Sequence, residues 1–333
     1  MSPISKMDPQ TVRFYSGSSH LQLSADICDY LGVPLEKTHI SRFSNDDLYI
    51  QLGASVRGRE VFIVQSLVPP VNDNLVELLM MLDIARSSAA KEVHAIIPYF
   101  SFARSDKKDA PRISITARLV ADLLQTAGAT HVMTVMLHSP QVHGFFSVPT
   151  DPLTSRPVFK KYLLGRDLTD TILVTPDMGQ AKSAARFAKD LGLPMAAGNK
   201  ERISDTKVRI NAIMGDRLSG HKRAIVYDDE IATGGSILEI CEHIVKAGIE
   251  DIMVICTHGV FTRGGQEKLA AVPQITEIVT TDTVYIPPEK RTSKLRVLSI
   301  ASLLGDAIRM NFTGQSISNL FAYGEDRQPE LPL

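Results

Sequence analysis

Short apolar runs alternate along the chain with segments whose apolar residues repeat at helical spacing. The runs predict strands over 61–65, 93–97, 131–137, 171–174, 223–227, 252–256 and 277–280. The helical spacing predicts helices over 72–88, 114–125, 179–191, 237–245 and 298–310, with Ser114 as the N-cap of the second. Repeated strand–helix–strand units imply parallel sheets covered by helices on both faces, so the expected fold class is α/β.

The pattern restarts about halfway along the chain, which predicts two similar α/β domains. We expect one domain over 11–152, a second over 153–312 and a C-terminal tail over 313–333, the end of which is polar and rich in proline. The proline and polar content of 150–157 fits a linker or crossover between the domains. Ligands of such sheets bind at the carboxyl ends of the strands, so polar clusters at those ends are the candidate sites.

Composition narrows the class of protein. The 333 residues, 44% hydrophobic and 22% charged, are typical of a soluble globular protein with two domains. The net charge of −1 argues against general affinity for nucleic acid or membrane surfaces, and no uncharged stretch is long enough to span a membrane. Residues 1–10 lack the apolar core of a signal peptide. The spacing of Cys28, Cys241 and Cys256 predicts buried small hydrophobes in a reducing cytosol, hence a cytoplasmic protein.

The stretch 224–236 carries the strongest chemical signal. An apolar run ends in Asp228 and Asp229, the sequence Ala-Thr-Gly-Gly-Ser follows at 232–236, and a helical pattern begins after it. The two glycines let the backbone approach a phosphate closely, and a helix N-terminus attracts an anion. The two acids could hold a sugar diol or a hydrated Mg²⁺. The stretch therefore indicates a sugar-phosphate site.

Ordinary turn and cap residues would explain Gly-Gly alone, but the ordered combination of strand, acids, loop and helix is much less expected by chance. The chain has neither the Gly-x-x-x-x-Gly-Lys-Ser/Thr order of a P-loop nor a Gly-x-Gly-x-x-Gly fingerprint. The stretch 224–236 resembles the phosphoribosyl-diphosphate-binding motif of type I phosphoribosyltransferases.

Four other polar clusters each have a functional and a structural interpretation. Residues 100–112 could grip a triphosphate and stack a base, or form a solvated charged loop. In 137–146, His138 at a strand end is a ligand or a hydrogen-bonded structural residue. In 175–182, Asp177 suits a second anion site or a metal-bridged site, or it caps a helix. The basic segment 199–207 is expected as a mobile loop over a transferring phosphoryl group, with a surface hairpin as the alternative.

Together the clusters resemble ribose-phosphate pyrophosphokinases of the phosphate-activated class. The resemblance runs from 14–20 to 316–321, through 42–45, 55–58, 71–79 and 97–100. It implies two similar type I phosphoribosyltransferase-like domains, each a mainly parallel sheet flanked by helices, with ATP on the first and ribose 5-phosphate on the second. The implied reaction transfers the β,γ-diphosphoryl group of ATP to the anomeric hydroxyl of ribose 5-phosphate. Its products are 5-phosphoribosyl 1-diphosphate and AMP.

The resemblance also assigns roles to residues of this chain. Lys200 and Arg202 would be catalytic residues on a flexible loop. The implied ATP-binding residues are Phe43, Asn45, Asp47, Arg104, Ser105, Lys107, Asp109 and His138, with Phe43 and Asn45 arriving from a neighbouring subunit. The implied ribose-5-phosphate-binding residues are Asp228, Asp229, Ala232, Thr233, Gly234, Gly235 and Ser236. His138 and Asp177 would contact Mg²⁺ or its waters.

Assembly and regulation are implied in the same way. Members of the family form hexamers built from dimers, so a homo-oligomer is expected, and phosphate or ADP are the expected effectors. The residues that match the effector region are Ser55, Arg57, Arg112, His143, Ser316 and Ser318.

Three positions depart from the family's pattern. Met136 replaces an Asp two residues before the metal-site His, Ser105 replaces a Gln after the ATP-loop Arg, and Gln180 replaces the second Gly of the diphosphate loop. Two other functions are alternatives to the diphosphotransferase. A non-catalytic regulatory subunit would keep the fold but would not need Lys200, Arg202, Asp228 and Asp229. A phosphoribosyltransferase that uses phosphoribosyl diphosphate would not need the doubled organisation or the segment 104–112.

Overall fold

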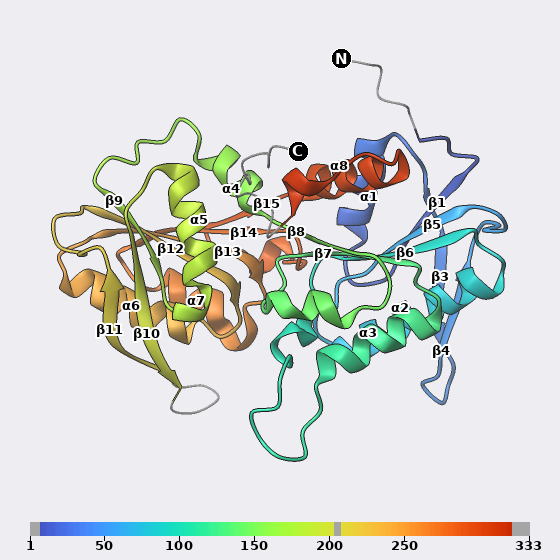
Figure 1. Ribbon diagram of the computed structural model, residues 1–333, viewed down its shortest axis with the longest axis horizontal. Helices are drawn as coiled ribbons and strands as arrows, with labels where there is room; N and C mark the ends of the chain where they lie inside the picture. Colours follow the sequence, from blue (N-terminus) through green and yellow to red (C-terminus); the bar gives the residue numbers. More distant parts are fainter. Residues whose placement is uncertain (1–6, 203–207, 322–333) are drawn as a thin grey trace, which may run out of the picture. The chain divides into compact units, whose positions relative to one another are not determined.

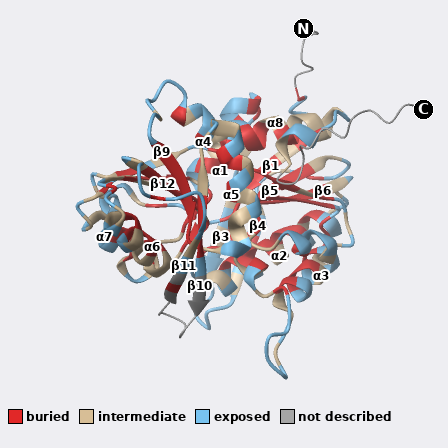
Figure 2. Cartoon of the chain, turned by 60° about the vertical axis from the view of Figure 1, so that its left-hand side comes forward, coloured by how far each residue is buried: buried red, intermediate tan, exposed pale blue. Residues whose placement is uncertain are grey.

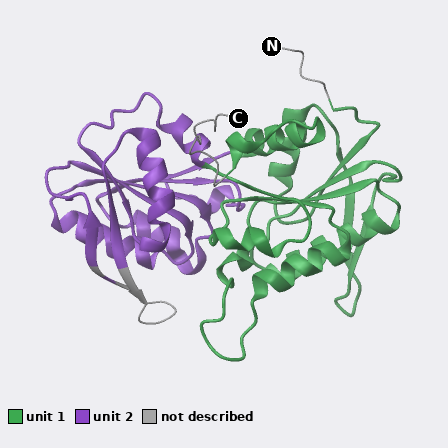
Figure 3. Ribbon diagram, viewed as in Figure 1, with its two compact units in different colours: residues 1–155, 300–333 green, residues 156–299 purple. Residues whose placement is uncertain are grey.

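The chain folds into two compact units, each built on its own sheet. The computed structural model describes residues 7–202 and 208–321. Unit 1 comprises 1–155 and 300–333, and unit 2 comprises 156–299 (Figure 3). In both units the central strands of the main sheet are buried and the outer helix faces are exposed (Figure 2). The α/β fold class, with mainly parallel sheets flanked by helices, is confirmed.

Unit 1 has a fully parallel sheet of six strands in the order β2-β1-β5-β6-β7-β8. The strands are β1 (Val12–Ser16), β2 (Leu35–Glu36), β5 (Glu60–Val64), β6 (Glu92–Ile97), β7 (His131–Val135) and β8 (Thr150–Leu153). The helices are α1 (Leu21–Leu31), α2 (Val71–Ser87), α3 (Thr116–Ala127) and α8 (Ala301–Phe312), with short 3₁₀ turns η1 (Ser101–Arg104), η2 (Pro140–Phe145) and η6 (Ser318–Leu320). A separate antiparallel hairpin joins β3 (Thr38–Arg42) and β4 (Leu48–Leu52).

Helices cover both faces of this sheet because its strands are apolar on both sides. Val61 and Ile63 of β5 belong to the core formed with α2 and α3, whereas Phe62 between them stacks on Phe14 at 4.6 Å on the opposite face. Figure 1 shows α2 and α3 below the sheet and α1 and α8 above it.

Unit 2 has seven strands in the order β11-β10-β9-β12-β13-β14-β15, parallel except for the β10–β11 pair. The strands are β9 (Thr171–Thr175), β10 (Met195–Arg202), β11 (Val208–Gly215), β12 (Arg223–Ile231), β13 (Asp251–Gly259), β14 (Ile275–Thr281) and β15 (Leu295–Leu298). The helices are α4 (Arg156–Leu163), α5 (Ala181–Leu191), α6 (Gly235–Lys246) and α7 (Gly265–Ala270), with 3₁₀ turns η3 (Met178–Gln180), η4 (Thr262–Gly264) and η5 (Pro288–Lys290).

In unit 2 as well, successive apolar side chains of a strand point to opposite faces of the sheet, and helices pack on both faces. Ile172 and Val174 of β9 pack in the core with α6 and α7, while Leu173 packs with Phe159 of α4 and Phe187 of α5. No helix in the described part of the chain is long and apolar enough to cross a membrane. The three cysteines are buried and free, as the sequence predicts.

The observed division differs from the expected one at both boundaries. The chain returns to unit 1 at residue 300, so the last helix belongs to the first unit. There α8 packs on α1: Tyr30 donates to Asp306 at 2.8 Å, and a Cβ on Gly305 would lie 2.4 Å from the Tyr30 ring. Its apolar pattern predicts a helix but cannot tell which sheet the helix covers. Most of the expected tail, residues 322–333, lies outside the described residues.

Two local expectations are corrected. The first passage between the units does fall within 150–157, between residues 155 and 156. The segment is not an open linker, however, because it contains β8 and the start of α4, with Thr154 and Ser155 buried between them. Ser114 does not cap the second predicted helix, because α3 begins at Thr116 and its N-cap is Ile115. The hydroxyl of Ser105 accepts instead from the Thr116 N–H at 3.1 Å.

Candidate active site

In unit 2, acidic residues gather at the carboxyl ends of two adjacent parallel strands. Strand β12 continues beyond the predicted end at Tyr227, through Asp228 and Asp229 to Ile231, because Asp228 and Glu230 still pair with β13. Asp229 is 3% exposed, whereas Asp228 is half-buried and accepts the Asp229 N–H at 2.9 Å. The two acids are therefore in unequal environments, and Asp228 is the more accessible.

The stretch 232–236 joins β12 to α6 as the sequence predicts, and its last two residues are the first of the helix. Gly234 is the N-cap of α6 and has φ +80°, a left-handed conformation that favours glycine. Because glycine has no side chain to accept from the first-turn N–H groups, this helix start suits an anion. The Cβ of any other residue at 234 would also lie 3.3 Å from the Gly265 carbonyl oxygen.

Asp177 follows β9, the strand next to β12, and so belongs to the same edge of the sheet. Its carboxylate accepts the Gly179 N–H at 2.7 Å and caps η3, which is the capping role that the sequence offered as the alternative. Gln180 is half-buried at the end of the same turn, directly before α5. Capping fixes the carboxylate in place at the sheet edge.

The described part of the basic segment 199–207, residues 199–202, is strand. The backbone of Lys200 and Arg202 lies in β10 and pairs with Ile210 and Val208 of β11, and a bulge precedes Lys200. This hairpin was the alternative to the expected mobile loop; residues 203–207 lie outside the described residues. Ala197 is the last β10 residue paired with β9, so Lys200 lies about 10 Å further along the strand direction. The hairpin thus carries both residues past the carboxyl edge of the sheet.

In unit 1, His138 also follows a strand at the carboxyl edge. It is half-buried and lies just after β7. Met136, where the family's pattern has an acid, has φ +45° and is 7% exposed. The buried hydroxyl of Thr154 points to the Met136 sulfur at 3.6 Å, and the Met136 N–H donates to the Leu153 carbonyl at 2.9 Å. Met136 therefore packs within unit 1 and offers no oxygen ligand.

The predicted ATP segment begins at η1, which follows β6. Arg104, Lys107 and Asp109 are exposed, which fits both a loop that binds a ligand and a solvated charged loop. Ser105 donates to the Ser114 carbonyl at 3.2 Å besides accepting from Thr116. Asp106 is 9% exposed and accepts from the Gln141 side chain, which joins this segment to η2.

The remaining ATP-binding candidates, Phe43, Asn45 and Asp47, lie in the turn of the β3–β4 hairpin. Phe43 is 58% exposed, and its ring lies edge-to-face with the Tyr49 ring at 5.7 Å between centroids. The Asn45 amide donates to the Asp47 carboxylate at 2.5 Å. Figure 1 shows this turn and the exposed loop before α3 at different places on unit 1, with α3 between them. One chain does not bring these two groups together.

The effector candidates come from separate parts of unit 1, and all are exposed. Ser55 and Arg57 follow β4, Arg112 lies before α3, and His143 lies in η2, where its ring contacts the Thr150 carbonyl at 3.1 Å. The remaining pair is Ser316 and Ser318, whose hydroxyls lie 2.6 Å apart.

Sequence reasoning missed polar residues at both sheet edges. In unit 2, Glu230 and its register partner His258 are buried, and His258 contacts the Thr283 hydroxyl at 2.9 Å. In unit 1, buried Glu77 accepts from the Ser18 hydroxyl at 2.7 Å and from the Gln65 amide at 2.8 Å. Ser18 and Glu77 line a cleft between α2 and the β3–β4 hairpin. Gln65, Glu230 and His258 lie at or near strand ends, and that position is the signal that could have found them, whereas Glu77 lies within α2.

Comparison with known proteins agrees with this arrangement. Residues 12–128 match the model of the N-terminal domain of ribose phosphate pyrophosphokinase, and residues 201–322 match the phosphoribosyl synthetase-associated domain. Ribose-phosphate pyrophosphokinases of Deinococcus radiodurans and Wolinella succinogenes are 45% and 41% identical, over 92% and 93% of this chain and 97% and 98% of theirs. The crystal structure of phosphoribosylpyrophosphate synthetase from Mycobacterium smegmatis superposes with a TM-score of 0.84 at 34% identity, covering 91% of this chain and 99% of that one. The chain therefore belongs to the ribose-phosphate pyrophosphokinase family.

Proposed function

We propose that this enzyme makes 5-phosphoribosyl 1-diphosphate and AMP from ATP and ribose 5-phosphate. The anomeric oxygen of the sugar attacks the β-phosphorus of ATP, the bond from that phosphorus to the α,β-bridging oxygen breaks, and AMP leaves. The observation that carries the proposal is the ordered site of unit 2, in a chain that matches the family over nine-tenths of its length. The protein contributes positioning and charge, because the reacting groups are all supplied by the substrates.

Ribose 5-phosphate is proposed to bind unit 2. Asp228 and Asp229 would accept hydrogen bonds from the ribose hydroxyls, since both lie at the carboxyl end of β12. The backbone of 232–236 and the start of α6 would hold the 5-phosphate, with hydroxyl donors from Thr233 and Ser236. This places the anion at the positive end of the helix dipole.

ATP is proposed to bind unit 1. Arg104, Lys107 and His138 would meet its phosphates, and Asp109 lies on the same exposed segment. Phe43, Asn45 and Asp47 of a neighbouring subunit would recognise the adenine, because the exposed Phe43 ring offers a stacking face. A homo-oligomer follows from this sharing, and a hexamer built from dimers is the form we propose.

Lys200 and Arg202 are proposed as the catalytic residues. Their cationic side chains would stabilise the charge that develops on the transferring diphosphoryl group. Strand β10 extends them beyond the edge at which Asp177 and Asp228 lie, which supports this role.

Mg²⁺ is the proposed cofactor, held by His138, by Asp177 and by substrate oxygens. The Asp177 carboxylate is a hard oxygen donor that its cap holds in place, so the site fits Mg²⁺ even though Met136 offers no oxygen. Bound Mg²⁺ would neutralise phosphate charge. We further propose a cytoplasmic location and phosphate or ADP as effectors of the exposed residues named above.

One assay tests the function. Pure protein is incubated with ATP, Mg²⁺ and ribose 5-phosphate, and AMP and phosphoribosyl diphosphate are followed together. Equal amounts of the two products are expected. A regulatory subunit would give neither product on its own, and a phosphoribosyltransferase would instead consume phosphoribosyl diphosphate with a base. Asp229→Asn, which keeps the shape of the side chain, serves as the impaired control.

A further inference from the structure

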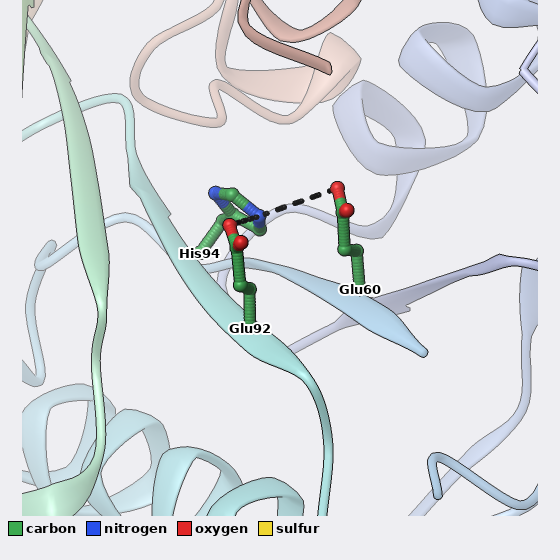
Figure 4. A group of neighbouring side chains, drawn as sticks. All are labelled: Glu60, Glu92 and His94. Carbon is green, nitrogen blue, oxygen red and sulfur yellow. Dashed lines mark ion pairs between the residues drawn. The ribbon is translucent and has the colours of Figure 1, made fainter. Parts of the chain in front are cut away.

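A second polar cluster lies at the opposite, amino edge of the unit 1 sheet. Glu60 begins β5 and Glu92 begins β6, and the two residues face each other in register. His94 lies two residues further along β6, on the same face as Glu92 (Figure 4). One ligand atom from each of the three side chains lies within 4.8 Å of the other two. The group can therefore close around one ion.

The charge of this cluster favours a cation. Like charges directly opposite each other on neighbouring strands repel. Lys91 offsets one of them, since its ammonium lies 2.9 Å from Glu60, but it is 61% exposed and contacts the oxygen that faces away from His94. The Glu60 oxygen nearer to His94 and the Glu92 oxygen both point toward the imidazole.

A hydrogen-bonded relay across the sheet orients the His94 ring. The Asp151 carboxylate lies 2.8 Å from His131 Nε2, and His131 Nδ1 lies 3.0 Å from His94 Nδ1. A carboxylate only accepts, so His131 carries its proton on Nε2 and accepts at Nδ1. His94 therefore donates from Nδ1, which leaves a lone pair on Nε2. Phe62 stacks on the His94 ring at 4.3 Å and fixes its plane.

That lone pair has no hydrogen-bond partner among the described residues. Nε2 is buried, and the His94 side chain is 2% exposed. The nearest oxygens, at 3.6 Å on Glu92 and 3.9 Å on Glu60, are too far for hydrogen bonds. The His94 Nε2 lone pair and the two carboxylates that it faces would all be satisfied by one cation bound between them.

We propose that Glu60, Glu92 and His94 bind a divalent transition-metal ion, Zn²⁺ being the best match. Bonds of about 2.1 Å in a tetrahedral site put donor atoms roughly 3.4 Å apart. The distances from His94 Nε2 to the Glu92 and Glu60 oxygens are 3.6 Å and 3.9 Å, and all three ligand atoms lie within 4.8 Å of one another, so the two carboxylates would move slightly inward on binding. One imidazole and two carboxylates suit Zn²⁺ better than Mg²⁺, which prefers oxygen ligands. Asp151 and His131 form the second shell that holds the ligand histidine in the required tautomer.

The ion would join the first residues of β5 and β6 and so stabilise unit 1. Glu92 is 46% exposed, which gives the ion a path from solvent. The site is separate from the one proposed for the substrates, because it lies at the amino edge of the sheet. Its existence does not depend on the proposed function.

The test measures Zn²⁺ on the full-length protein after chelation and reloading, with Mg²⁺ in excess to compete at oxygen-rich sites. Metal content per chain and the midpoint of thermal unfolding are read for wild type and variants. Glu92→Gln is the principal variant, because its half-exposed side chain can change without loss of packing; circular dichroism checks its fold. Asp251→Asn is the matched control, since Asp251 begins β13 with a side chain 49% exposed and faces Arg223 rather than a histidine.

We expect wild type and Asp251→Asn to retain one more Zn²⁺ per chain than Glu92→Gln, and to gain thermal stability from Zn²⁺. Asp151→Asn should keep the three ligands and weaken Zn²⁺ binding about 10-fold to 100-fold, because the tautomer of His131 is no longer fixed. Equal Zn²⁺ content and equal thermal midpoints in wild type and Glu92→Gln would overturn the proposal, and a bound water at Nε2 would then be the explanation.

Discussion

Two residues that depart from the family's pattern have physical roles inside unit 1. Met136 fills a buried position at the end of β7, where its sulfur meets the Thr154 hydroxyl. Ser105 uses its hydroxyl twice, toward Ser114 and toward the first N–H of α3. Both side chains therefore make contacts within unit 1 that do not involve a ligand.

Ser105→Ala should lower the free energy of unfolding by about 1 kcal/mol, the usual effect of losing a side chain that accepts from a helix start. ATP affinity should change little, because the hydroxyl is already used at α3. Urea unfolding and ATP titration measure the two quantities, and Ser105→Thr, which keeps a hydroxyl, is the control. A variant of normal stability with weakened ATP binding would assign the hydroxyl to ATP instead.

Asp229→Asn should weaken ribose 5-phosphate binding by roughly tenfold to a hundredfold, the range for a lost hydrogen bond to a charged group, and leave ATP binding nearly unchanged. The reason is its place at the end of β12, directly before the proposed phosphate loop. Calorimetric titration with each substrate gives the comparison. Asp251→Asn should leave both affinities intact, because Asp251 begins β13 and lies at the amino ends of the strands, opposite the proposed site. A larger effect on ATP than on the sugar would contradict the assignment of β12.

At the scale of elements, the β10–β11 hairpin is the test of the catalytic proposal. Lys200→Ala and Arg202→Ala should each lower turnover by roughly 10²–10³-fold with much smaller changes in substrate affinity, because both act on charge that develops in the transition state. Steady-state kinetics separate the two effects. Normal turnover in both variants would remove the hairpin from the mechanism.

A polar contact between elements makes unit 2 sensitive to acid. Glu277 of β14 accepts from Tyr162 of α4 and from Arg166 at 2.6 Å. Burial raises the pKa of Glu277, but the hydrogen bonds from Arg166 and Tyr162 outweigh burial and hold it below the ordinary 4.5. A depressed folded-state pKa means that the stabilisation is present above pH 4.5 and is lost as the pH falls through the folded-state pKa.

Glu277→Gln should therefore lower the free energy of unfolding by about 1–2 kcal/mol at pH 7 and by less in acid. Urea unfolding of wild type and variant across the acid range measures the difference. A constant difference at every pH would show that the charge of Glu277 is not the stabilising feature.

The sequence predicts elements well where apolar periodicity is strong and less well where polar residues pair. Strands β5, β6 and β9 lie within a residue of their predicted bounds, because both faces of each are apolar. Strand β12 runs past its predicted end, since Asp228 and Glu230 keep their backbone pairing. The β3–β4 hairpin and the side on which α8 packs depend on contacts between distant residues, which no local pattern contains.

For the candidate site, motif order predicts the phosphate loop and the acids of unit 2. It does not predict buried partners such as Glu230 and His258, because their role depends on the register between β12 and β13. Nor does it predict the cluster of Glu60, Glu92 and His94, whose members come from the neighbouring strands β5 and β6 and meet only when the sheet forms.

At the scale of the whole molecule, the position of Phe43 raises the question of how many chains build one ATP site. The hairpin that carries it leaves the ring 58% exposed, and the turn of this hairpin lies apart from the loop that precedes α3 (Figure 1). The exposed face of the ring is available to stack on a base bound to another chain. A site assembled from two copies would use it.

Complementation between inactive variants tests this sharing. Phe43→Ala and Arg104→Ala should each have low activity alone, because every ATP site in the homo-oligomer lacks one group. Mixed oligomers formed by co-expression should recover activity, since a chain with intact Arg104 then meets a chain with intact Phe43 at some sites. If one chain supplied both groups, each site would still lack one of them and no mixture would recover. Light scattering must show an assembly larger than a dimer in every sample, because loss of assembly in Phe43→Ala would explain low activity without a shared site.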